Sequence, residues 1–237
     1  MPKRYWYVIL TYIAMQMSGA LIIPFIRIYD IDPIFASGVW SVISFGVGLA
    51  VIIYLLREDM KQVDMRSSSE IGTIALWALL GMLLAYSAQI ASILIETYIL
   101  HIEPGSQNTS NIMDIARTAP IFIIVVTVFA PVLEELIFRK IIFGSIYKRT
   151  NFIIAALASA LIFGLVHNDN PHILIYTSMG MVFAFLYVQT KRIIVPIIAH
   201  MGINTFAVVM QYSVDPAELE RRLEQFEQQI QMIFLGG

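Results

Sequence analysis

The chain has 237 residues, no cysteine, and a formal net charge of −2 from 15 basic and 17 acidic residues. The lack of cysteine excludes disulfides, thiol catalysis and thiolate metal sites, and the near-neutral charge without a basic stripe argues against nucleic-acid binding. Hydrophobic residues make up 58% of the chain and charged residues 14%, against about 45–50% and about 25% in soluble domains. The composition therefore predicts a membrane protein.

Apolar segments long enough to cross a bilayer follow one another along the chain. A hydrocarbon core of about 30 Å requires about 20 apolar residues in a helix. We expect an all-α, polytopic membrane bundle of about seven transmembrane helices joined by short polar linkers, among them 57–70 and 101–118. The fifth segment is the shortest and could be buried among its neighbours. The segments cover residues 6–26, 34–56, 71–100, 120–147, 152–167, 172–190 and 193–212.

Loop cations predict the orientation of this bundle. The first segment lacks a small-residue cleavage site, so we expect it to be retained rather than removed as a signal peptide. With a cytoplasmic N-terminus, the inside loops would carry nine lysines and arginines and the outside loops and tail four. Because cytoplasmic loops carry an excess of cations, an N-terminus in the cytoplasm is expected.

We expect residues 1–212 to form a single transmembrane domain, with the tail 213–237 as a separate amphipathic helix. Asp215 suits the N-cap of that helix, and Pro216 suits its first position. Its apolar residues recur at steps of three and four, which favours a helix lying on the membrane or packed on the bundle. A role in dimerisation or regulation is the alternative. These residues are Leu219, Leu223, Phe226, Ile230 and Ile233.

Three charged residues lie within six positions of the fourth segment: Glu134, Glu135 and Arg139. A charge at the bilayer centre costs about 2.5 kcal/mol or more, so pairing or function must offset it. Glu135 and Arg139 are four residues apart on one helix face and can pair. The pairing leaves Glu134, rotated by about 100°, as a candidate general base. The alternative is a charge cluster at the inner helix end, with its cations reaching the interface.

Two further residue pairs with a histidine lie in later segments. Phe163 precedes His167 by one turn at the end of the fifth segment, where a histidine is also a common interfacial residue. His200 and Asn204 share one face of the seventh segment, where they could instead be interhelical hydrogen-bonding groups worth about 0.6–2 kcal/mol. Prolines upstream of these charged and polar groups, Pro131 and Pro196, predict helix kinks.

The order of these motifs, EExxxR, FxxxH and HxxxN on successive segments, resembles the CPBP family. This family includes type II CAAX prenyl endopeptidases and bacterial Abi or bacteriocin-immunity proteins, and the resemblance covers about residues 120–206, the expected catalytic core. It implies an intramembrane endopeptidase in a bacterial or archaeal cytoplasmic membrane. By resemblance, Glu134 and His167 activate water and His200 and Asn204 stabilise the oxyanion. The supporting residues are Glu135, Arg139 and Phe163.

A metal is the open question of this expected site. Glu134, His167 and His200 could supply three ligands to a catalytic zinc and leave one position for water. The helical HExxH pair of many zinc peptidases is absent, and a metal would occupy the base and the donors just assigned. We therefore favour metal-free activation of water, with zinc as the alternative. His101 and His172 match no motif and are interpreted as interfacial, although His172 could line the same mouth.

Alternatives to proteolysis also follow from the residues. The same fold could serve as an immunity or scaffold protein, and intramembrane acid and histidine sets also occur in transporters and proton relays. Expected partners are membrane lipid and a peptide or lipidated protein tail, such as a prenylated CAAX tail, a pheromone or a bacteriocin leader.

Counting along the segments places His167 nearer the outer face and His200 nearer the inner face, so a shared site requires tilted or kinked helices.

Overall fold

The structure is a computed structural model, and it describes residues 1–64, 71–213, 221 and 225. Every regular element in these residues is helical. Six stretches are long and apolar enough to cross a membrane, and a seventh apolar helix, Phe152–Val166, is shorter. The predicted all-α membrane bundle is confirmed, including the short fifth segment. The predicted tail helix lies outside the described residues, apart from single positions.

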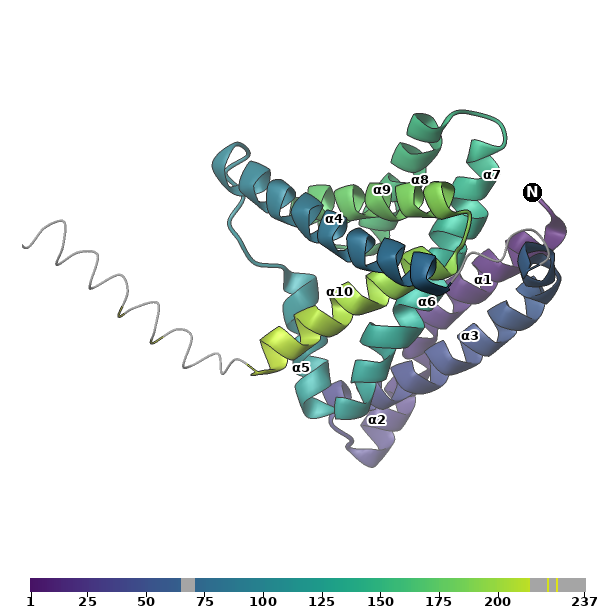
Figure 1. The fold of residues 1–237 in the computed structure, drawn as a ribbon. Helices are drawn as coiled ribbons and strands as arrows, with labels where there is room; N and C mark the ends of the chain where they lie inside the picture. Colours follow the sequence, from purple (N-terminus) through teal and green to yellow (C-terminus); the bar gives the residue numbers. More distant parts are fainter. Residues whose placement is uncertain (65–70, 214–220, 222–224, 226–237) are drawn as a thin grey trace, which may run out of the picture.

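The N-terminal half forms a helical hairpin and a long crossing helix (Figure 1). Helices α1 and α3 lie side by side and are joined at one end by an Arg4–Asp59 ion pair of 2.7 Å. Helix α4 crosses the bundle and packs on α9 and α10. The elements are α1 (Lys3–Met17), η1 (Ser18–Ile22), α2 (Ile23–Tyr29), α3 (Pro33–Asp64) and α4 (Ile71–Tyr98).

The predicted linker 101–118 contains a helix that was not predicted, α5 (Gln107–Thr118). The Ser106 side chain caps it by accepting a hydrogen bond from the Thr109 backbone N–H at 3.0 Å. The helix is too polar to span a membrane but buries one edge, including Met113 and Ala116. Helix α3 also continues into the other predicted linker, as far as Asp64.

The fourth segment is an irregular helix in which α-helical and π-helical turns alternate. Pro131, where a kink is predicted, stands at the change between them, in the first turn of the α-helical stretch Ala130–Glu134. The π-helical turns lie on both sides of that stretch. The elements are η2 (Pro120–Phe122), η3 (Val125–Phe129), α6 (Ala130–Glu134), η4 (Glu135–Phe143) and α7 (Gly144–Tyr147).

The C-terminal helices pack tightly around this segment. A Cβ atom at Gly180 would lie 2.9 Å from Ala160 Cβ, so glycine permits the close approach of α8 and α9. Pro196 lies in the first turn of α10, where its missing N–H removes no helical bond, and the kink predicted there is wrong. The elements are α8 (Phe152–Val166), η5 (Asn170–His172), α9 (Ile173–Thr190) and α10 (Ile194–Ser213).

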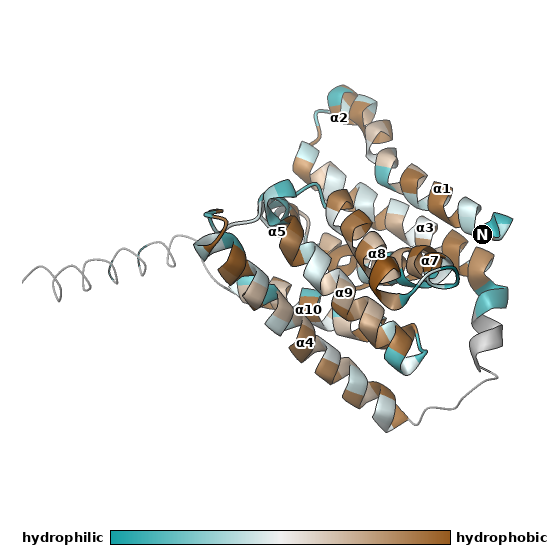
Figure 2. Ribbon diagram, turned by 90° about the horizontal axis from the view of Figure 1, so that it is seen from above, coloured by the Kyte–Doolittle hydropathy of each residue, from teal (hydrophilic) through white to brown (hydrophobic). Residues whose placement is uncertain are grey.

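The bundle exposes many large apolar side chains and buries a few charged ones. Apolar ribbon runs along the outer helices in Figure 2, and large apolar side chains such as Trp6 and Leu10 are exposed. Glu135, Arg139 and His200 are buried in contrast. This arrangement suits a helix bundle surrounded by lipid hydrocarbon. It also places polar groups predicted for the site in the interior of the bundle.

Candidate active site

The three sequence motifs meet in one buried cluster. Glu134 ends α6 and Glu135 begins η4, His167 follows the last residue of α8, and His200 lies within α10. The Phe163 ring connects the histidines, with ring-centroid distances of 4.5 Å to His167 and 6.1 Å to His200. The irregular fourth segment and the packing of α8 and α10 thus bring together residues that the sequence placed at different depths.

Glu135 holds two other residues of the cluster. One carboxylate oxygen, Oε1, lies 2.9 Å from His200 Nδ1, and the other, Oε2, lies 3.2 Å from Arg139 Nε. Because a carboxylate only accepts, His200 donates through Nδ1 and its Nε2 atom faces elsewhere. The side chains of Glu135 and Arg139 are buried at 0% and 1% exposure, so this pair is closed to solvent and to substrate.

Glu134 is placed differently from its neighbour. Its side chain is 13% exposed, and its Oε2 atom lies 3.7 Å from His200 Nε2. That separation is too long for a hydrogen bond, although such contacts are often loose in the absence of substrate. Of the two adjacent carboxylates, Glu134 is therefore the more accessible one.

Aromatic rings surround the buried guanidinium of Arg139. Its central carbon lies 4.4 Å from the Phe163 ring centroid and 5.3 Å from that of Phe183. Cations are attracted to ring faces at such distances. Phe183 also stacks on His200, with centroids 4.7 Å apart and planes at 21°. The phenylalanine of the FxxxH motif therefore contacts the arginine and both histidines.

His167 and Asn204 are each fixed through a backbone carbonyl. His167 Nδ1 lies 2.7 Å from the Phe163 carbonyl oxygen; a carbonyl accepts, so Nδ1 carries the proton and Nε2 is left for chemistry. Asn204 Nδ2 donates to the Val126 carbonyl at 3.0 Å. An amide nitrogen carries two protons, so Asn204 retains one for a ligand.

The donor set does not assemble as a metal centre. Within the described ranges, no group of three histidine or acidic side chains is arranged to hold a metal ion. The Nδ1 atoms of His167 and His200 are engaged by a carbonyl and a carboxylate, which leaves the Nε2 atom of each ring as the nitrogen open to a ligand. The use of a metal therefore stays a matter for experiment.

A second buried polar pair was missed from the sequence. His172, interpreted as interfacial, is buried within the protein: its Nδ1 lies 2.8 Å from Glu96 Oε2 and its Nε2 lies 2.7 Å from the Gly105 carbonyl oxygen. The pair borders a cavity of about 610 Å³ between α4, α5 and α10, which the motif residues do not line. Glu96 stands alone in an apolar segment, and that isolated charge was the available signal.

Comparison with known proteins agrees with the geometry. Residues 116–206, which contain all three motifs, match the family described as type II CAAX prenyl endopeptidase Rce1-like. The chain is 44% identical to YdiL of Bacillus subtilis (strain 168), over 100% of this chain and 99% of YdiL. YdiL is provisionally named as a membrane peptidase. The chain belongs to the type II CAAX prenyl endopeptidase family.

Other relatives extend this result. The membrane-embedded CAAX protease MroQ of Staphylococcus aureus (strain USA300) is 36% identical over 94% of this chain and 95% of its own length. The protein YxdF of Lactococcus lactis subsp. lactis (strain IL1403) is 35% identical over 80 residues, which are 33% of this chain and 44% of YxdF. No solved structure matches the chain. The protein is thus an integral membrane protease of this family.

Proposed function

We propose that this protease hydrolyses its peptide bond with water activated by Glu134 and His167, inside the helix bundle. The observation that carries the proposal is the division between two adjacent glutamates. Glu135 is fully buried against His200 and Arg139, while Glu134 is partly exposed and held by no close hydrogen bond among the described residues. A carboxylate that water can reach, beside preorganised donors, is the arrangement that general-base hydrolysis requires.

Each step of the reaction has a group to perform it. Glu134 takes a proton from water as the oxygen attacks the carbonyl carbon, and the same proton then passes to the departing amine nitrogen. The Nδ1–H group of His167 donates a hydrogen bond to the Phe163 carbonyl, and its Nε2 atom accepts a hydrogen bond from this water. A protonated His200 donates to Glu135 through Nδ1 and to the oxyanion through Nε2, and the remaining Asn204 proton is the second donor.

The proposed substrate is a membrane-associated peptide, with a prenylated CAAX-like tail as the first candidate. The support is the location of the site among membrane-spanning helices and the name of the relative MroQ, a CAAX protease. Because the donors do not converge as a metal centre, we propose that hydrolysis needs no metal. Activity should then persist in a strong chelator, and its loss with recovery on adding zinc would contradict this.

The test uses detergent-purified wild-type protein, Glu134→Gln, and Glu103→Gln as a matched control in an exposed loop. Each is incubated with a peptide library of prenylated and plain tails, and products are identified by mass spectrometry. Cleavage by wild type and Glu103→Gln, but not by Glu134→Gln, is expected. Cleavage by Glu134→Gln would remove the proposed base. Partner binding without any cleavage would instead favour an immunity or scaffold role.

A further inference from the structure

A tyrosine outside the three motifs lies directly on the imidazole of His167. Tyr176, in the first turn of α9, stacks on the ring with centroids 4.3 Å apart and planes at 25°. The imidazole also contacts the Phe163 ring, with ring centroids 4.5 Å apart and ring planes at 64°. Rotation of the imidazole about the Cβ–Cγ bond of His167 would disturb the stack and break the hydrogen bond from Nδ1 to the Phe163 carbonyl.

The tyrosine hydroxyl is held by hydrogen bonds to several elements. It donates to Asp169 Oδ2 at 3.2 Å and accepts from Asn108 Nδ2 at 3.3 Å. The Ser106 hydroxyl lies 3.4 Å away, but its proton is directed to the same Asp169 oxygen at 2.5 Å. The ring that covers His167 is therefore fixed by a buried carboxylate and by α5.

The groups that hold the Tyr176 hydroxyl also contact other helices of the bundle. Ser106 caps α5, and the carbonyl of the neighbouring Gly105 lies 2.7 Å from His172 Nε2. His172 in turn contacts Glu96 on α4. The support of Tyr176 thus rests on α4, α5 and α9, while the residue it contacts ends α8. Tyr176 is therefore held by more polar contacts than a side chain that only fills space between two helices.

We propose that Tyr176 is a positioning residue for His167, with Asp169 as its anchor. The stack keeps the imidazole in the orientation in which Nδ1 bonds to the Phe163 carbonyl and Nε2 is free for the reaction. Outer groups that orient a reactive histidine fix both its tautomer and its ring direction. This inference rests on the proposed role of His167, so its test includes a readout that does not depend on proteolysis.

The kinetic arm compares Tyr176→Leu, Tyr176→Phe and Asp169→Asn with a matched control. The control is Tyr5→Phe, which removes a phenol-to-aspartate hydrogen bond of 3.3 Å at Asp59, away from the cluster. Small misplacements of a reacting group cost up to about a hundredfold. We therefore expect kcat to fall about ten- to a hundredfold in Tyr176→Leu and less in Tyr176→Phe, which keeps the stack. Asp169→Asn should resemble Tyr176→Phe, and Tyr5→Phe should match wild type.

The spectroscopic arm observes the imidazole directly. Protein labelled with ¹⁵N in the imidazole rings gives one pair of ring-nitrogen signals for each of the four histidines, and His167→Ala assigns the relevant pair. These signals report which ring nitrogen carries the proton. Wild type, Tyr176→Phe and Tyr5→Phe should show the Nδ1–H form of His167, and Tyr176→Leu should show a mixture of the Nδ1–H and Nε2–H forms. A His167 that keeps the Nδ1–H form alone in Tyr176→Leu would overturn the proposal, even if thermal stability fell. This result is decisive even if no peptide is cleaved.

Discussion

At the scale of single residues, the arginine of the EExxxR motif acts on the site without meeting substrate. Arg139 is buried beside Glu135, with Phe163 and Phe183 rings at its guanidinium. Its nitrogens have no well-formed hydrogen bond among the described residues, so charge pairing and ring contacts hold it. By pairing with Glu135, Arg139 helps to hold the carboxylate that orients the His200 ring.

Replacing this arginine should destabilise the fold. Arg139→Met leaves Glu135 as a buried carboxylate with one fewer cation, and breaking a buried pair costs about 3–5 kcal/mol. Adding Glu135→Gln in the same chain should recover part of that loss. The control Arg57→Met breaks an exposed pair with Glu58, a kind worth about 0–1 kcal/mol. Chemical unfolding in detergent measures all three, and equal losses for Arg139→Met and Arg57→Met would contradict the pairing.

At the scale of elements, the irregular fourth segment explains why Asn204 lies where it does. The Ala130 N–H bonds to the Val125 carbonyl, five residues back. Continued in that register, the Val126 carbonyl would bond to the N–H of residue 131, which is proline and has none. Asn204 supplies the missing donor at 3.0 Å. The same side chain thus joins α10 to the segment that carries the two glutamates.

This double role of Asn204 can be separated by a pair of substitutions. Asn204→Ala leaves the Val126 carbonyl without that donor, and an unsatisfied buried group costs about 1–3 kcal/mol. Adding Pro131→Ala restores a backbone N–H and should recover stability without recovering activity, because the oxyanion donor is still missing. Thermal unfolding and peptide cleavage, measured on both variants, test this. Recovery of both properties together would show that Asn204 acts only on the fold.

Much of this architecture follows from the sequence, and the exceptions have physical reasons. The apolar segments and the i,i+4 pair of Glu135 and Arg139 are local patterns, so they were predictable. The Glu96–His172 contact joins residues 76 apart, and no local period reports such a pair. Helix α5 was missed because a short amphipathic helix beside a membrane has the composition of a loop. The approach of His200 to the Phe163 ring depends on the packing of α8 and α10, which no local sequence period reports.

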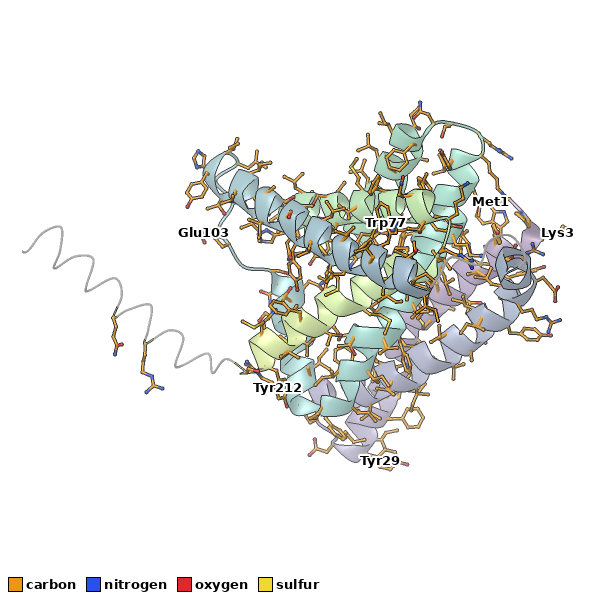
Figure 3. The ribbon with its side chains drawn as sticks, in the orientation of Figure 1. Met1, Lys3, Tyr29, Trp77, Glu103 and Tyr212 are labelled. Carbon is orange, nitrogen blue, oxygen red and sulfur yellow. The ribbon has the colours of Figure 1, made fainter. Side chains whose placement is uncertain are left out.

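At the scale of the whole molecule, the distribution of charge relates the bundle to the membrane. Figure 3 shows Lys3 and Glu103 on opposite sides of the bundle. Lys3 belongs to the cation-rich set of termini and loops, and Glu103 belongs to a loop on the opposite side in the predicted topology. Because Ser106, which hydrogen-bonds to the Asp169 anchor of Tyr176, lies at the end of that loop, the predicted orientation places the anchor on the outer side.

The orientation can be tested directly because the chain has no cysteine. Single substitutions Lys3→Cys, Arg149→Cys and Glu103→Cys place one thiol at each exposed site. With the N-terminus in the cytoplasm, a membrane-impermeant maleimide should label only Glu103→Cys in intact cells, and all three after the cells are opened. Labelling of Lys3→Cys and Arg149→Cys in intact cells, with protection of Glu103→Cys, would reverse the assigned topology.

The central claim is that two adjacent glutamates have separate tasks, and comparing Glu134→Gln with Glu135→Gln tests it most directly. Peptide cleavage and thermal unfolding are measured on each purified variant beside wild type. Glu134→Gln should lose activity by about 10²–10⁴-fold, the range for a general base, and should unfold at the wild-type temperature. Glu135→Gln should lose activity and also unfold at a lower temperature, because Arg139 loses its buried partner. Retained cleavage by Glu134→Gln, or equal unfolding temperatures for the two variants, would contradict this division.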